Sequence, residues 1–352
     1  MTRIRDIANI LSSSTSMATD AEVTSAISAQ FVAGKNKIIN GDFGIWQRGT
    51  SFSNVSGYTA DRWQFSWGGT STSNITRQDL PIGSIPGGNE SLYFARYTRT
   101  TTVGDDYFLQ RVEDVRTLLG KTVTFSFWAK ANVATTISQV YGATSYGSGG
   151  SSGSGFGNFS GIAIGTTWAR YSFTGTVESG VGKTIGANSF TELVFKFATA
   201  MGNIVVDIWG VQLEVGSTAT NFTTATGTTQ GELAACQRYY FRNTSISTTS
   251  GFMWLGIIAN YFSSTRIDGY INFPVRMRTI PSSIDISNIG WIRAWGLGVS
   301  TITSATINTT GTSDFGAILQ FTTTGAVTTD PHLAYYILSN NSAGYVGLSA
   351  EL

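Results

Sequence analysis

Few side chains in this sequence could carry out covalent chemistry. His332 is the only histidine, and neither a nucleophile-elbow motif nor a metal-binding His-Glu-x-x-His pattern surrounds it. Because it follows Asp330-Pro331, we interpret it as a turn or strand-edge residue rather than as part of a Ser-His-acid triad. Cys236 is the only cysteine, which excludes an intrachain disulfide and a cysteine-based zinc site. We expect Cys236 to pack as a small, buried apolar residue.

Glycoside cleavage by a pair of carboxylates is harder to exclude, because the two acids can come from distant positions in a chain. The candidate acids are Asp105, Asp106, Glu113 and Asp114. We interpret the first two as an exposed turn. The sequence has no fixed repeat of about 20–50 residues, which argues against a long β-helix. We therefore expect no enzymatic activity and no cofactor.

Noncovalent binding of sugars has more candidate residues. Sugars offer hydroxyl groups and apolar C–H faces, so their sites combine stacking aromatic rings with a few amides, acids or arginines. The candidate glycan-binding residues are Trp128, Tyr141, Tyr146, Phe156, Tyr58 and Trp67. We interpret Trp46 and Trp63 as framework residues. Asp61 and Arg62 are either polar neighbours of a sugar or a structural ion pair.

Composition argues against two classes of partner. Charged residues make up 12% of the 352 residues, about half the usual share, and the net charge is +1. There is therefore no electrostatic case for binding nucleic acid or an anionic membrane surface. No stretch approaches the roughly 20 apolar residues of a membrane span, and the first residues lack the apolar core of a secretory signal peptide.

Residues 1–35 differ from the rest and predict two short helices. Their apolar faces are marked by Ile4, Ile7 and Leu11, and then by Val23, Ile27 and Phe31. Thr19 and Glu22 fit a capping box at the start of the second helix. Helices this short are not stable alone, so we expect these six apolar residues to dock or oligomerise the chain. The alternative is that the helices pack on their own domain.

From residue 36 the pattern becomes that of β-strands. In residues 122–130, Phe125 and Phe127 fall on one face and Trp128 on the other, a period of two. Further strands are expected at residues 169–173, 193–197 and 204–213. Many short strands separated by turns favour an antiparallel sandwich over a parallel α/β sheet. We interpret the Gly- and Ser-rich residues 141–161 as a long loop within this sandwich.

Residues 225–352 predict a second, smaller β domain. Thr229 and Glu232 fit a capping box that opens a short helix. Strands are expected near residues 254–262, 266–273, 318–322 and 332–338. In residues 273–282, apolar positions alternate with Arg276 and Arg278, which predicts a strand. Pro274 indicates that this strand lies at the edge of a sheet. These arginines either meet acids on a neighbouring subunit or are solvated.

Five segments resemble a known family in their order and spacing. They are NGDFGIWQRGTSFSNVSGYTADRW from Asn40, LLGKTVTFSFWAKA from Leu118, VDIWGVQLEVG from Val206, ACQRYYFR from Ala235 and FPVRMRTIPS from Phe273. Residues 36–222 resemble the carbohydrate-binding-module-like β-sandwich of bacteriophage tail-fibre and related virion proteins. The last two segments resemble elements of phage tail tip domains.

The resemblance implies a mainly β fold: an antiparallel jelly-roll-like β-sandwich over residues 36–224, a smaller β domain over residues 225–352 and a short helical N-terminal segment. It also implies a homotrimeric virion fibre, made in the host cytoplasm, that attaches to host-surface glycan. Other virion proteins would hold it through its N-terminus. The alternatives are a structural virion protein without a sugar site, such as a head fibre, decoration protein or spacer, and a glycan-degrading enzyme.

Related sandwiches often hold a structural calcium ion through acidic residues of their last strand. The matching stretch here, Trp209 to Leu213, lacks the acidic pair. We therefore expect no bound metal ion, with Asp42 and Asp207 as the remaining candidates for oxygen ligands.

Overall fold

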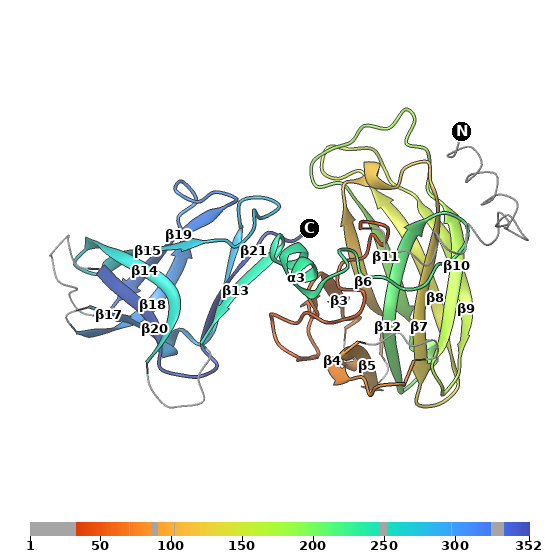
Figure 1. Cartoon of the computed structure of the whole chain (residues 1–352), viewed down its shortest axis with the longest axis horizontal. Helices are drawn as coiled ribbons and strands as arrows, with labels where there is room; N and C mark the ends of the chain where they lie inside the picture. The colour runs from red at the N-terminus through yellow and green to blue at the C-terminus, as the bar shows by residue number, and fades with distance from the viewer. Residues whose placement is uncertain are drawn as a thin grey trace, which may run out of the picture.

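The computed structural model describes residues 33–69, 71–85, 91–101, 103–245, 252–296, 298–324 and 334–352 (Figure 1). These residues form a β-sandwich and a C-terminal β domain with one α-helix between them, which confirms the predicted mainly β fold. The predicted N-terminal helices and His332 lie outside the described residues. No helix in the described part of the chain is long and apolar enough to cross a membrane.

The described residues of the sandwich form two antiparallel sheets of six strands each. The first sheet has the order β1 (Ser51–Ser53), β4 (Thr72–Asp79), β5 (Tyr93–Thr101), β12 (Ile204–Val215), β7 (Thr122–Ala131) and β10 (Ala169–Thr176). The second has the order β2 (Gly57–Tyr58), β3 (Trp63–Ser66), β6 (Asp106–Glu113), β11 (Phe190–Phe197), β8 (Thr135–Ser145) and β9 (Gly155–Ile164). Two 3₁₀ turns, η1 (Val115–Thr117) and η2 (Thr199–Met201), join strands. The strands predicted from period-two patterns are therefore present as β7, β10, β11 and β12.

Aromatic rings fill the space between the two sheets. Phe127 of β7 packs edge-on against Phe195 of β11, with ring centroids 4.9 Å apart. Trp63 of β3 stacks on Phe108 of β6 at 4.8 Å. Trp63 is fully buried and Trp46 nearly so, which confirms their framework role. Burial of each such ring contributes about 1.5–3 kcal/mol, so these rings contribute substantially to the stability of the sandwich.

The Gly- and Ser-rich stretch is not the long loop that its composition predicts. It contains the end of β8 and most of β9, and these two strands pair with each other. Gly142 lies opposite Phe156 in this pair, and a Cβ atom on Gly142 would lie 2.2 Å from the Phe156 ring. The glycine therefore makes room for a neighbouring ring in the sheet rather than providing flexible backbone.

The C-terminal domain follows helix α3 (Thr229–Gln237). Thr228, rather than the predicted Thr229, caps this helix by accepting a hydrogen bond from the Gly231 amide. Glu232 does not complete a capping box, because its carboxylate accepts hydrogen bonds from the amides of Asn40 and Thr226. The helix is thereby attached to the sandwich through Asn40, and Cys236 on it is buried as expected.

The described residues of the C-terminal domain form a closed antiparallel barrel with a small sheet beside it. The barrel has the order β14 (Met253–Ser263), β15 (Arg266–Asn272), β19 (Gly316–Thr323), β18 (Val299–Ile307), β17 (Ile292–Trp295) and β20 (Ala334–Ser339). The small sheet has the order β13 (Tyr240–Thr244), β21 (Tyr345–Ser349) and β16 (Ser283–Ile286), and η3 (Ile289–Trp291) precedes β17. A single apolar cluster fills both the barrel and the space beneath the small sheet.

Residues 273–282 do not form the predicted edge strand, because β15 ends before them. Pro274 has no amide hydrogen with which to extend the pairing of β15 with β19. Arg276 forms an ion pair of 3.0 Å with Asp314, and Arg278 donates hydrogen bonds to backbone carbonyl oxygens just after β21. Both arginines therefore have partners within their own chain.

The sandwich and the C-terminal domain meet at two arginines of the sandwich. Glu351 follows β21 and forms ion pairs with Arg62 and, at 3.2 Å, with Arg48. The Arg62 guanidinium is 1% exposed and lies 3.4 Å from the centroid of the Tyr239 ring. The Arg48 guanidinium lies in the same way over the Tyr240 ring, at 3.5 Å. Figure 1 shows the end of the chain at this joint, between the two domains.

Asp61 and Arg62 are therefore not the ion pair that their adjacency suggested. Asp61 lies 3.6 Å from Arg48, while Arg62 pairs with Glu351. Arg62 has a φ of +70°, a left-handed conformation that is uncommon for a residue other than glycine.

We predict that Glu351→Gln lowers the free energy of unfolding by about 3 kcal/mol or more, because Arg62 would remain buried without its counter-charge. Urea denaturation measures this loss. Arg116→Ala is the control: Arg116 forms an exposed ion pair with Asp114, so its removal should change stability by less than about 1 kcal/mol. Equally small effects of both substitutions would show that Glu351 does not hold the joint.

Candidate functional site

Most of the six aromatic residues predicted to bind glycan are engaged within the sandwich. The Trp67 indole donates a 2.6 Å hydrogen bond to a backbone carbonyl, and the Tyr58 hydroxyl donates one of 2.9 Å at the domain joint. Phe156 is half-buried and packs against Gly142. Tyr146 is 1% exposed, so the expected surface position is wrong for this residue. Tyr146 directly follows β8, in the connection between β8 and β9.

Trp128 lies on the outer face of the first sheet, as the strand pattern predicts, but it is not a free platform. It is half-buried and joins an apolar cluster on that face. The other members are Leu80, Ile85, Phe94, Trp168, Trp209 and Phe222.

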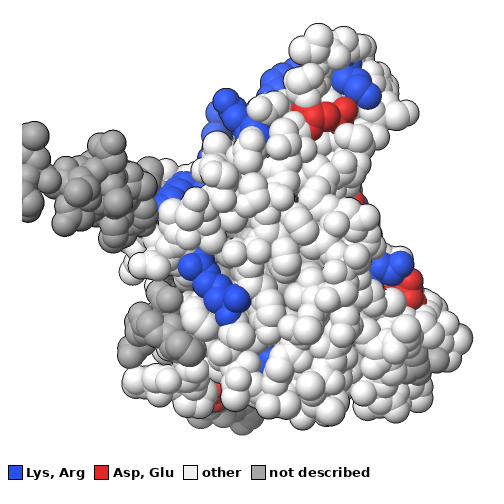
Figure 2. All heavy atoms as spheres, turned by 90° about the vertical axis from the view of Figure 1, so that its right-hand side faces the viewer, with Lys and Arg blue, Asp and Glu red and all other residues white. Residues whose placement is uncertain are grey.

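The side of the sandwich shown in Figure 2 carries few and scattered charged side chains, in keeping with the low charge of the sequence.

Tyr141 lies on the outer face of the second sheet. Its cross-strand neighbour is Val194 of β11. Glu192 and Lys196 lie on either side of Val194 and on the same face of the sheet. Burial raises the pKa of Tyr141, with the negative charge of Glu192 as the next cause. Glu192 is paired with an arginine at 3.4 Å, and Lys196 with Asp105 at 2.8 Å. The charged groups around Tyr141 are therefore already partnered.

The candidate catalytic acids have structural contacts. Asp106 is not in an exposed turn: it is fully buried in β6 and accepts hydrogen bonds from Ser73, at 2.5 Å, and from Tyr97, at 2.7 Å. Glu113 ends the same strand and forms an ion pair of 3.1 Å with Arg238 of the C-terminal domain. These two acids therefore support the core and the domain joint.

The two candidate calcium ligands lie in different surroundings. Asp207 of β12 pairs with Arg96 at 2.7 Å and with Lys130 at 3.7 Å. Asp42 lines a hollow of about 290 Å³ together with Glu232. Burial, and next the negative charge of Glu232, raise the pKa of Asp42 to about 6. No group of three or more His, Cys, Asp or Glu side chains that could hold a metal ion is found in the described residues.

The C-terminal barrel presents a different site on its outer surface. Trp254 of β14 lies opposite Leu338 of β20, and Tyr336 of β20 lies opposite Trp295 of β17. These positions face outward because the alternate residues, such as Ile337, fill the barrel. A register shift between Trp254 and Ile257, at a glycine with a φ of +74°, turns β14 at this point.

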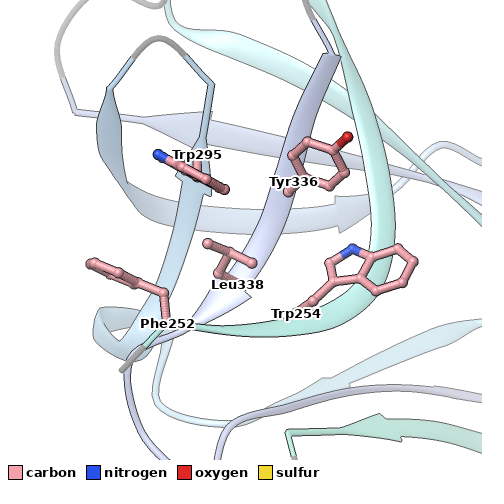
Figure 3. A pocket seen from close by; sticks show the side chains of 5 residues that line it. All are labelled: Phe252, Trp254, Trp295, Tyr336 and Leu338. Atoms are coloured by element: carbon pink, nitrogen blue, oxygen red, sulfur yellow. The ribbon is translucent and has the colours of Figure 1, made fainter. Parts of the chain in front are cut away.

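Four aromatic side chains and one leucine line a pocket of about 460 Å³ at this surface. They are Phe252, Trp254, Trp295, Tyr336 and Leu338. Figure 3 shows the four rings standing around Leu338, which forms the floor. The rings are 42–56% exposed, whereas Leu338 is buried beneath them. The ring of Tyr336 lies 6.4 Å from that of Trp254 and 6.3 Å from that of Trp295.

The polar atoms of the pocket lie at its rim. The Tyr336 hydroxyl and the Trp295 indole nitrogen point away from Leu338 in Figure 3, and neither makes a hydrogen bond to a described residue. The Trp254 indole nitrogen donates to the Ile257 carbonyl oxygen at 3.3 Å. None of the five lining side chains carries a charge. Such a site can stack rings on an apolar surface and offer a few hydrogen bonds, but it supplies no acid or base.

Sequence reasoning predicted two strands of this site, β14 and β20, but neither β17 nor the site itself. In β14 the inward residues Leu255 and Ile257 and the outward residues Trp254, Ile258 and Phe262 are all apolar. A strand that is apolar on both sides usually indicates burial of both faces. Here one apolar face of β14 lies at the surface. Only the closed barrel shows which of the two faces is inside and which is outside.

Comparisons with known proteins give the following picture. The sequence matches no protein-family model, and no curated protein matches it. Among solved structures, an enzymatically active domain of tailspike protein 4 of bacteriophage CBA120 is 19% identical, covers 52% of this chain and 22% of its own, and has a TM-score of 0.32. The present chain thus matches about a fifth of that tailspike chain.

Two other solved structures are similar over the whole of their own, shorter chains. The CBM22-1 xylan-binding domain from Paenibacillus barcinonensis is 12% identical and covers 54% of this chain and 100% of its own, with a TM-score of 0.30. The family 11 carbohydrate-binding module of a Clostridium thermocellum cellulosomal cellulase is 10% identical and covers 49% and 97%, with a TM-score of 0.30. Similarity at this level assigns no ligand or activity.

We predict that Asp42→Asn stabilises the protein at pH 7 by about 1–2 kcal/mol and has little effect near pH 4. The pKa of Asp42 is about 6 in the folded state and 3.8 in the reference state, so the folded state binds the proton more tightly. Stability from this group therefore falls as the pH rises from about 4 to about 6, and asparagine removes that fall. Urea denaturation at both pH values measures the difference.

Asp79→Asn is the matched control, because Asp79 is exposed at the end of β4. As a surface substitution, it should change stability by no more than about 0.5 kcal/mol at either pH. If Asp42→Asn behaves in the same way, the buried charge of Asp42 does not weaken the fold.

Proposed function

We propose that this chain is a phage virion fibre protein, of the tail, that attaches the particle to host-surface glycan by noncovalent binding. The observation that carries this proposal is the pocket of four exposed aromatic rings on the C-terminal barrel. Stacking of rings on the C–H faces of sugars is the recognition chemistry that such a pocket offers. The sequence resemblance to phage tail-fibre sandwiches supports the virion context.

The arrangement of the domains suits this role. The described chain enters at the sandwich, where the Gly34 amide bonds to the Ala225 carbonyl oxygen at 2.8 Å. The pocket strands β17 and β20 lie at the opposite end of the molecule, at the left of Figure 1. A chain held through residues 1–35 would therefore carry the pocket outward. Several copies on one particle would multiply weak contacts into firm attachment.

We propose that attachment involves no bond cleavage. None of the five side chains that line the pocket is a carboxylate, and most glycoside hydrolases use a pair of carboxylates. Asp106 and Glu113 are also committed to hydrogen bonds and ion pairs inside the protein. Incubation with host polysaccharide should accordingly release no reducing ends.

One observation favours the second candidate, a structural virion protein without a sugar site. The pocket residues Trp295 and Tyr336 belong to a longer row of apolar side chains across five barrel strands. In cross-strand order this apolar row is Val299, Trp295, Tyr336, Ile258 and Tyr270. Each member is 42–51% exposed. Exposed apolar rows of this kind also occur where subunits meet.

We predict that the double variant Trp254→Ala/Trp295→Ala loses glycan binding by at least about tenfold, because two stacking faces are removed. Binding of purified protein to a glycan array and to host cells measures the loss. Phe262→Ala is the control, since Phe262 is equally exposed on β14 but lies outside the pocket. Unchanged binding by the double variant would contradict the proposal.

We further propose a homotrimer, and we predict a native mass of about three times 37.6 kDa by light scattering of the full-length protein. The variant Ile258→Ser/Tyr270→Ser alters the apolar row outside the pocket and should leave this mass unchanged if the barrel surface binds sugar. A fall to the monomer mass would assign the row to subunit contact and favour the structural role.

A further inference from the structure

We infer that the aromatic pocket takes an uncharged sugar residue that directs a methyl group onto Leu338: an N-acetylhexosamine or a 6-deoxyhexose at the end or on a branch of a glycan. This inference rests on the proposed function and adds the class of ligand. It follows from the charge, the hydrogen-bonding groups and the ring geometry of the pocket.

None of the five described side chains that line the pocket carries a charge that could compensate an acidic sugar. The charged residue on its strands that lies nearest in register is Arg293, opposite Leu338. Its guanidinium folds back and donates hydrogen bonds to the carbonyl oxygens of Gly290 and Ile292. A sialic or uronic acid carboxylate in the pocket would lose its hydration without gaining an ion pair from the lining side chains, which is costly. An uncharged sugar avoids this cost.

The distribution of polar atoms selects a part of the sugar with few hydroxyl groups. The floor is the side chain of Leu338, and the Tyr336 hydroxyl and the Trp295 indole nitrogen lie at the rim (Figure 3). A sugar hydroxyl buried against the floor would lose its hydration without gaining a hydrogen-bond partner, which is unfavourable. A methyl group placed there gains contact instead, while the ring hydroxyls or the acetamide group reach the rim.

The rings also exclude a flat ligand surface. The planes of Trp254 and Tyr336 are inclined at 77°, and those of Trp295 and Tyr336 at 44°. Coplanar rings would suit the face of an extended, flat polysaccharide, whereas inclined rings surround a residue that inserts between them. A volume of about 460 Å³ lies in the lower part of the range for small-ligand pockets, about 300–1,000 Å³. It accommodates one or two sugar residues, as at a chain end or branch.

Saturation-transfer NMR on the full-length protein tests this inference. The free sugars are N-acetylglucosamine, fucose, glucose, glucuronic acid and N-acetylneuraminic acid, the last carrying the same acetyl group together with a charge. We expect the strongest transfer to the acetyl methyl or the C6 methyl group, and at least tenfold weaker binding of glucose and of both acids. N-acetylglucosamine carries only the acetyl methyl group and fucose only the C6 methyl group, so comparing them shows which methyl group the pocket prefers.

Two variants locate the effect. Leu338→Asn keeps the branched shape of the floor side chain but makes it polar, and should remove the preference for the methyl-bearing sugars. The matched control, Phe262→Ala, should retain it. Light scattering of each variant shows whether the assembly is intact.

The outcomes separate the inference from the proposed function. Equal binding of glucose or of an acidic sugar, lost in Trp254→Ala/Trp295→Ala, would overturn the methyl-group inference and leave glycan attachment standing. Transfer that persists in that double variant would overturn the assignment to this pocket. No transfer from any glycan, with a changed native mass for Leu338→Asn, would overturn both and assign the pocket to a subunit contact.

Discussion

The relative placement of the two domains depends on a charge buried at their joint. Arg62 is almost fully enclosed, and a guanidinium in that position is tolerable only with a carboxylate and further contacts around it. Glu351 of the C-terminal domain supplies the carboxylate, and the Tyr239 ring covers the guanidinium face. Arg62 also donates to a backbone carbonyl of β6 at 2.8 Å. Since an ion pair of this kind is directional, the joint favours one orientation of the barrel over others.

The joint also explains why the sandwich is a poor place for the binding site. Tyr58 and Arg111 lie on the outer face of the second sheet, and both donate hydrogen bonds to the Leu352 carbonyl oxygen, at 2.9 and 2.8 Å. The C-terminal domain thus occupies part of the face where Tyr141 is found. On the outer face of the first sheet, Trp128 is packed into its own cluster. The barrel, at the other end of the molecule, keeps its aromatic rings accessible.

The sequence was sufficient to predict some of the strands, such as β7, β10 and β11, because period-two alternation is a local property of each segment. Others, such as β4, β5 and β17, were not predicted. It was misleading at the Gly-rich hairpin, where the need for Gly142 comes from a ring on the paired strand. It could not identify the partner of Arg62, which lies 289 positions away. It also could not identify the pocket, since Trp254 and Leu255 are both apolar and only barrel closure separates inside from outside. The role of Gly142, the partner of Arg62 and the position of the pocket all depend on contacts between segments that are distant in the sequence.

The scarcity of charge has a consequence for how such a protein could bind. Many of the arginines and acids discussed above form ion pairs within the fold, as Arg62 and Asp207 do, and are not available on a binding surface. The pocket itself offers ring faces, a leucine floor and two polar atoms. Contacts of this kind are short-ranged and are not screened by dissolved salt, in contrast to attraction between exposed charges. Attachment through the barrel would therefore be governed by the shape and the apolar surface of the ligand, and by the number of copies that engage at once.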